Sequence, residues 1–75
     1  MKKLRIIVPY GSALDSYLAD AGFIYDEITR LSDKTYFKMN ITSYFQLIEF
    51  LVSKFRLTDY SIRCDDGVVT FLVRP

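Results

Sequence analysis

The chain has 75 residues, nearly balanced charge (Lys+Arg 10 against Asp+Glu 9) and 51% apolar residues. This length predicts a single small domain spanning residues 1–75, with a thin stability margin because so short a chain has little interior. The net charge of +1 excludes a strong overall attraction to nucleic acid or to anionic lipid. Any electrostatic preference must therefore come from a local arrangement of charges.

The composition offers few residues suited to catalysis or to metal binding. Cys64 is the single cysteine and histidine is absent, so an internal disulfide is excluded and the ligand set for zinc is poor. A nucleophile needs a base beside it, and Cys64 falls on the apolar side of an expected strand, where it is interpreted as a small core residue. We expect a protein without enzymatic activity, cofactor or bound metal.

Neither a signal peptide nor a membrane span is indicated. The apolar run after the basic start is short and ends at Pro9. No stretch reaches the roughly 20 apolar residues that cross a bilayer. We therefore expect a soluble, cytoplasmic protein that does not contact membranes.

The first half of the chain predicts a strand, a helix and a hairpin. Residues 3–8 alternate as a strand, and residues 12–21 form a helix that Ser12 caps with Asp15 three positions later. Residues 23–31 and 34–41 are predicted to pair as a hairpin around Ser32 and Asp33. The expected register places Thr29 opposite Tyr36, Glu27 opposite Lys38, Asp26 opposite Met39 and Ile24 opposite Ile41. Asp26 is the one misfit, because it would lie among apolar side chains.

The second half predicts a longer helix and another hairpin. Residues 42–55 have an apolar stripe at helical spacing, and Phe50 projects from the polar side. Ser43 and Gln46 form a capping box, or Thr42 caps the helix one residue earlier. Residues 60–64 and 68–73 are predicted to pair around Asp66-Gly67, a favoured type I′ turn, with Cys64 opposite Val69.

The order of these elements is strand, helix, strand, strand, helix, strand, strand. It predicts an α+β domain in which two helices pack on one face of a mainly antiparallel sheet of four or five strands. The first six elements follow the order of the split βαβ, or ferredoxin-like, arrangement. The other face of such a sheet is open.

That open face is the expected binding surface. Six of its residues are candidate partner contacts: Lys3, Arg5, Tyr25, Tyr36, Lys38 and Arg63. Phe50 is a second candidate, on the longer helix. Cations interleaved with tyrosines can contact phosphates and stack on bases, but residues 34–39 lack the glycines and aromatic spacing of the RRM pattern.

A protein-binding module is the function that the sequence favours most. It would be a small regulator or inhibitor of a larger protein machine, of the size that phages and mobile elements often encode. The alternative is a nucleic-acid-binding domain that uses the open sheet face, and a small-ligand sensor is a third hypothesis. A homodimer through a sheet edge or the open face is compatible with all three.

Overall fold

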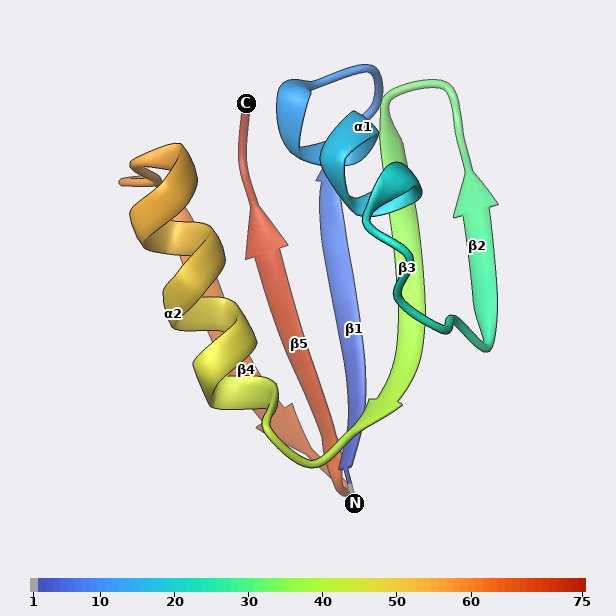
Figure 1. The fold of residues 1–75 in the computed structure, drawn as a ribbon, viewed down its shortest axis with the longest axis vertical. Helices are drawn as coiled ribbons and strands as arrows, with labels where there is room; N and C mark the ends of the chain where they lie inside the picture. Colours follow the sequence, from blue (N-terminus) through green and yellow to red (C-terminus); the bar gives the residue numbers. More distant parts are fainter. Residues whose placement is uncertain (1) are drawn as a thin grey trace.

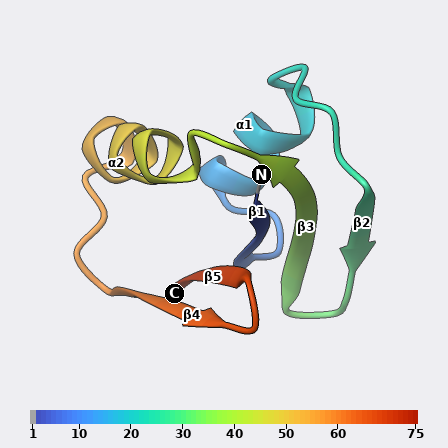
Figure 2. The same cartoon turned by 90° about the horizontal axis from the view of Figure 1, so that it is seen from below.

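A computed structural model describes residues 2–75, which form a small α+β domain with two helices and a five-stranded mixed sheet (Figure 1). The elements in chain order are β1 (Lys2–Pro9), α1 (Ala13–Asp20), β2 (Glu27–Arg30), β3 (Lys34–Ile41), α2 (Tyr44–Phe55), β4 (Tyr60–Asp65) and β5 (Val68–Val73). The strands lie in the order β2-β3-β1-β5-β4. Both helices cover the same face of this sheet, as the view from below shows (Figure 2).

The strand order agrees only in part with the ferredoxin-like prediction. β3 lies between β1 and β2, as the split arrangement requires. However, β5 rather than β4 lies beside β1, and the two run parallel, with Ile6 opposite Phe71. The extra hairpin reverses the chain once more after α2, so the sheet is mixed. In the inner position the side chains of β5 are alternately buried, whereas most of β4 is exposed.

The core lies between the helices and the sheet and follows the period-two pattern of the strands. Leu4, Ile6 and Val8 of β1 are buried with alternate residues of β3 and β5. Both hairpins have the predicted registers where they are paired, including Glu27 opposite Lys38 and Cys64 opposite Val69. Because side chains alternate between the two faces of a sheet, the residues between these buried core positions of β1, β3 and β5 lie on the other face.

The start of α1 is held by a buried polar network. Ser12 Oγ accepts a hydrogen bond from the Asp15 N–H at 3.2 Å. The carboxylate of Asp15, only 4% exposed, accepts hydrogen bonds at 2.9 Å from the Gly11 N–H and from Thr35 Oγ1 on β3. The predicted cap is therefore formed, and it also ties α1 to the sheet. At α2 the predicted capping box is wrong, because Ser43 makes no side-chain capping bond.

The segment before β2 departs from the predicted strand. Regular pairing begins only at Glu27, and Ile24 is 89% exposed rather than opposite Ile41. The Asp26 carboxylate accepts hydrogen bonds from Lys3 Nζ at 3.2 Å and Asn40 Nδ2 at 3.0 Å, on the side away from the helices. An unpaired carboxylate is costly to bury, so the chain leaves the ladder where Asp26 would have faced the core.

The core position predicted for Cys64 is also wrong. It lies opposite Val69, on the helix side of the sheet, yet it is exposed. Ile62 on the same strand is 45% exposed. β4 is an edge strand, and the helices leave much of its surface uncovered.

Candidate functional site

The face of the sheet opposite the helices, called here the open face, carries a row of polar side chains that crosses all five strands. Register pairs Glu27 with Lys38, Lys38 with Arg5, Arg5 with Thr70, and Thr70 with Arg63. We call these five residues the basic row. Side chains directly opposite each other on neighbouring strands lie about 5 Å apart at Cβ, so the row is a continuous surface with three cations.

A second row lies beside the basic row. Tyr36, Ile7 and Leu72 are neighbours across β3, β1 and β5, with Thr29 and Ser61 at the two ends. Tyr36, Ile7 and Leu72, called here the apolar row, are partly buried without any helix over them. The open face thus joins an apolar centre to a charged border.

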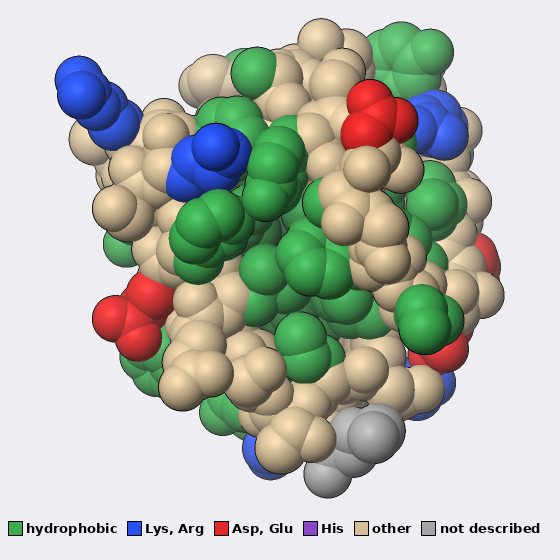
Figure 3. All heavy atoms as spheres, in the orientation of Figure 1, with side chains coloured by type: hydrophobic (Ala, Val, Ile, Leu, Met, Phe, Trp, Pro, Cys, Tyr) green, Lys and Arg blue, Asp and Glu red, His purple; other side chains and the backbone are tan. Residues whose placement is uncertain are grey.

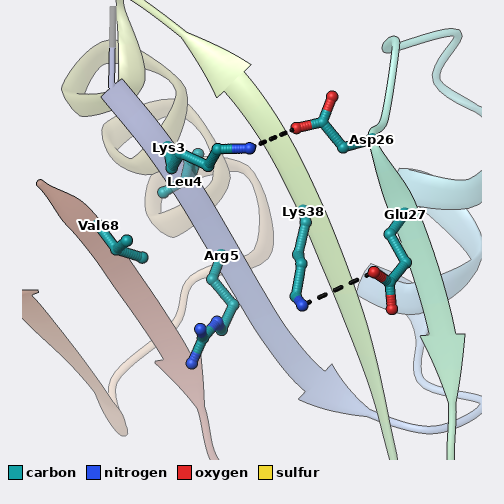
Figure 4. A pocket seen from close by; sticks show the side chains of 7 residues that line it. All are labelled: Lys3, Leu4, Arg5, Asp26, Glu27, Lys38 and Val68. Atoms are coloured by element: carbon teal, nitrogen blue, oxygen red, sulfur yellow. Dashed lines mark hydrogen bonds and ion pairs between the residues drawn. The ribbon is translucent and has the colours of Figure 1, made fainter.

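Three of the cations on this face have carboxylate neighbours. Lys3 Nζ lies 3.2 Å from Asp26 Oδ2, and Lys38 Nζ lies 3.7 Å from Glu27 Oε1 (Figure 4). The Arg63–Asp65 pair is looser, at 3.9 Å. The hydrogen bond from Thr29 and the charge of Lys38 lower the pKa of Glu27. Such exposed pairs stabilise the fold little and can exchange partners readily.

Arg5 differs from these cations. It forms no ion pair with a carboxylate within residues 2–75, and its Nε is buried without a hydrogen-bond acceptor. Figure 4 shows its side chain directed away from Asp26 and Glu27, toward the β5 side. It lines a shallow hollow of about 250 Å³ together with Lys3 and Lys38. The carboxylates of Asp26 and Glu27 line the same hollow, so it presents both signs of charge.

Five of the six residues predicted on the open face lie there together, and one does not. Lys3, Arg5, Tyr36, Lys38 and Arg63 all lie on the open face, because they alternate with core residues or pair with residues that do.

The placement of Tyr25 on the open face is wrong. Its hydroxyl donates a 2.6 Å hydrogen bond to the Leu18 carbonyl of α1, and its ring packs 5.1 Å from that of Phe37. Burial, and secondarily the charge of Tyr17, raise its pKa to about 12. Tyr25 precedes the regular part of β2, so the alternation that predicted its direction does not apply there.

Phe50 lies on the helix side of the molecule and is 47% exposed. Its ring centroid is 6.3 Å from that of Tyr17, which in turn packs 5.4 Å from Phe55. This cluster joins the two helices, and apolar side chains gather between them in the space-filling view (Figure 3). Phe50 and the open face are consequently two separate surfaces.

A groove between α2 and β4 was missed by sequence reasoning. This α2–β4 groove has a volume of about 340 Å³. Its lining residues are Phe45, Ile48, Glu49, Val52, Ser53, Tyr60 and Ile62. The apolar pattern of β4 predicts burial, and nothing local to that strand signals that it would lie at the edge.

Residues 2–75 contain neither a metal-binding cluster nor a membrane-spanning helix. No cluster of three or more Cys, Asp or Glu residues is arranged to hold a metal ion. Neither α1 nor α2 is long and apolar enough to cross a membrane. In comparisons with known proteins, no family model, no curated protein and no solved structure matches this chain significantly.

Proposed function

We propose that the chain is a non-enzymatic binding module that docks an acidic region of another protein on its open face. In this proposal binding is the whole activity, and the chain regulates or inhibits a larger protein by covering one of its surfaces. A chain of 75 residues without histidine offers few groups for catalysis, which is consistent with such a role.

The combination of the two rows supports a protein partner. Protein interfaces typically have an apolar centre with a polar border, and Arg and Tyr are enriched in them. The open face has the apolar row beside the basic row, with Arg5 and Tyr36 next to the junction. A partner with a small apolar patch beside Asp or Glu residues would match both rows.

The observation that carries the proposal is the unpaired state of Arg5. A buried N–H without an acceptor is unfavourable, and like charges directly opposite on a sheet repel. Arg5 has both problems, because its Nε lacks an acceptor and Lys38 lies opposite. A carboxylate of a partner would offset the repulsion between Arg5 and Lys38, and an Arg–carboxylate pair can form two parallel hydrogen bonds once the guanidinium turns outward.

The nucleic-acid alternative has weaker support. Single-stranded nucleic acid binds by stacking on several aromatic rings along a cationic groove. With Tyr25 turned toward α1, Tyr36 supplies the one ring on the open face among the strand residues of the described chain.

The test is affinity capture from the native cells with a triple variant of the basic row. Arg5→Gln, Lys38→Gln and Arg63→Gln remove three charges from the open face. Lys2→Gln, Lys54→Gln and Arg56→Gln remove three charges elsewhere and serve as the matched control. We expect one protein to be retained by the wild type and the control, with or without nuclease, and to be lost from the basic-row variant.

Two results would contradict the proposal. Retention of the same protein by the basic-row variant would exclude the open face as its docking surface. Loss of all retained material after nuclease treatment, with binding that falls steeply as salt rises, would favour the nucleic-acid alternative. Circular dichroism of both variants controls for folding.

A further inference from the structure

The outer edge of β4 is free. No strand lies beyond β4 within residues 2–75. The N–H of Arg74 donates to the Asp59 carbonyl at 3.0 Å, in continuation of the β4–β5 register. Because hydrogen-bonded and non-bonded pairs alternate in antiparallel strands, the odd residues of β4 bond to β5. The backbone groups of Tyr60, Ile62 and Cys64 therefore point outward, where a further strand would lie.

This edge has little that would block strand addition. Proteins protect edges with short strands, bulges, proline or charged side chains, above all lysine. β4 has six residues without Pro or Lys, and its register with β5 runs without interruption. Its two charged residues, Arg63 and Asp65, form a loose ion pair with each other at 3.9 Å. The opposite edge, β2, has only four residues.

Exposed apolar side chains lie directly above this edge. Tyr60 and Ile62 form the strand side of the α2–β4 groove, and Phe45 belongs to its helix side. Ile62 is 45% and Phe45 57% exposed. The free backbone groups and the apolar side chains thus face the same incoming strand.

We propose that β4 pairs with β4 of a second copy of this chain, antiparallel about a two-fold axis at Ile62. In this register residues 60–64 of one copy lie opposite residues 64–60 of the other. All three outward backbone units of each strand then form hydrogen-bonded pairs, and Ile62 meets Ile62 of the second copy beneath the two α2 helices. The two five-stranded sheets become one continuous sheet.

Backbone pairing favours this register over its neighbours. An axis at Ser61 would set Asp59 opposite Arg63 of the second copy, but it would place Cys64 opposite Thr58, which lies outside the strand. An axis at Arg63 would place two arginines directly opposite, which is unfavourable. An axis at Cys64 would run the strand onto the turn at Asp66 and Gly67, where the strands end. With the axis at Ile62, only Asp59 and Asp65 face each other, at the ends. There Arg74 at 3.1 Å and Arg63 at 3.9 Å offset their charges.

A second copy fits this surface better than an isolated extended peptide. Stable interfaces bury about 1,200 Å² or more in total, which strand pairing over so few residues does not reach alone. A peptide would add a strand, whereas a second copy also brings its own Phe45 and Ile62 to the join. Association is therefore expected to depend on concentration and to require contacts from α2.

The first experiment measures self-association by sedimentation equilibrium over a wide range of micromolar concentrations. The wild type should form dimers, and Ile62→Lys should remain monomeric. Ile28→Lys is a matched control, because Ile28 is also an edge-strand isoleucine and is 40% exposed. A wild type that stays monomeric throughout, even if it binds an extended apolar peptide, would overturn the proposal, as would equal loss of dimer in both variants.

The second experiment tests the register by disulfide formation. Opposite residues of a hydrogen-bonded pair lie about 5.5 Å apart at Cα, within the range that a disulfide spans. The double variant Ile62→Cys, Cys64→Ser should give a covalent dimer under mild oxidation, whereas wild-type Cys64 should not link to itself. Ready linkage through wild-type Cys64 would overturn this register.

These outcomes are independent of the open-face proposal. Ile62→Lys lies on the helix side of the sheet and leaves the basic row unchanged, so it should retain the captured protein. Loss of dimer with retained capture therefore separates the two surfaces.

Discussion

Arg5 lies directly opposite Lys38 at the centre of the sheet, where β1 pairs with β3. The charge of Lys38 is partly offset by Glu27 at 3.7 Å, but Arg5 has no such neighbour within residues 2–75. Like charges opposite each other destabilise a sheet. The fold therefore tolerates a local repulsion on the surface that we propose as its docking face. At this position the same charge lowers the stability of the fold and, in our proposal, strengthens binding of the partner.

Arg5→Gln should raise the free energy of unfolding while it weakens partner binding. Removal of the repulsion between β1 and β3 should raise the free energy of unfolding by about 0.2–1 kcal/mol. Urea denaturation measures this change. Lys2→Gln removes the same charge from an exposed position off the open face and should leave stability unchanged. A lower free energy of unfolding for Arg5→Gln would show that the guanidinium stabilises the fold by contacts that outweigh its repulsion.

Arg56→Gly should stabilise the protein by about 1 kcal/mol, because Gly adopts a left-handed conformation without steric cost. Arg56 ends α2 with φ 52° and ψ 48°, and its N–H donates to the Ser53 carbonyl at 3.4 Å. The check is thermal denaturation. Arg56→Ala removes the same charge but keeps the strain, so an equal gain in that variant would contradict the conformational explanation.

Thr35→Val should destabilise the protein by about 1–3 kcal/mol, the usual cost of leaving a buried polar group without its partner. The Thr35 hydroxyl is fully buried and donates to Asp15, which is only 4% exposed. Thr29→Val serves as the control in urea denaturation, since the Thr29 hydroxyl donates to Glu27 at the surface. If both variants lost the same free energy of unfolding, burial of the hydrogen bond to Asp15 would not account for the effect of Thr35→Val.

The stability that Tyr25 provides should disappear at high pH. Burial raises its pKa from 10.0 to about 12, so the unfolded chain ionises first as pH rises through this interval. Stability from Tyr25 is complete below pH 10 and falls toward pH 12. Tyr25→Phe loses the hydrogen bond to Leu18, so it should be less stable by about 0.5–1.5 kcal/mol at neutral pH.

Urea denaturation at a series of pH values should show this difference between Tyr25→Phe and the wild type narrowing above pH 10. Tyr36→Phe, on the open face, is the control for the loss of a tyrosine hydroxyl that does not donate to α1. A constant difference between Tyr25→Phe and the wild type would exclude ionisation of Tyr25 as the cause.

Local chemistry explains why parts of the fold could be predicted from the sequence. Asp66 and Gly67 have φ values of 50° and 76°, as the type I′ turn predicted from this pair requires. That turn determines the register of β4 with β5. Ser12 likewise caps α1 with the Asp15 N–H, since a cap depends on neighbours only three residues apart.

The errors lie where distant parts of the chain compete. Tyr25 has an ordinary strand position in the pattern and Asp26 is its one misfit. The ring of Tyr25 packs under α1 and the carboxylate of Asp26 pairs with Lys3, so the strand starts later. Cys64 lies on the predicted side of its strand and is exposed, because α2 does not cover the outer edge of the sheet.

The sequence by itself determined the period of each element, the two turns that join the hairpins, and the two-sided division of the strands into core and open face. These properties depend on neighbours in the chain. Only the tertiary structure decided that β5 lies inside and β4 outside, because that choice compares the apolar area that each strand can bury against β1 and the helices. It is this choice that aligns Arg5, Thr70 and Arg63 in one row and leaves the edge of β4 free.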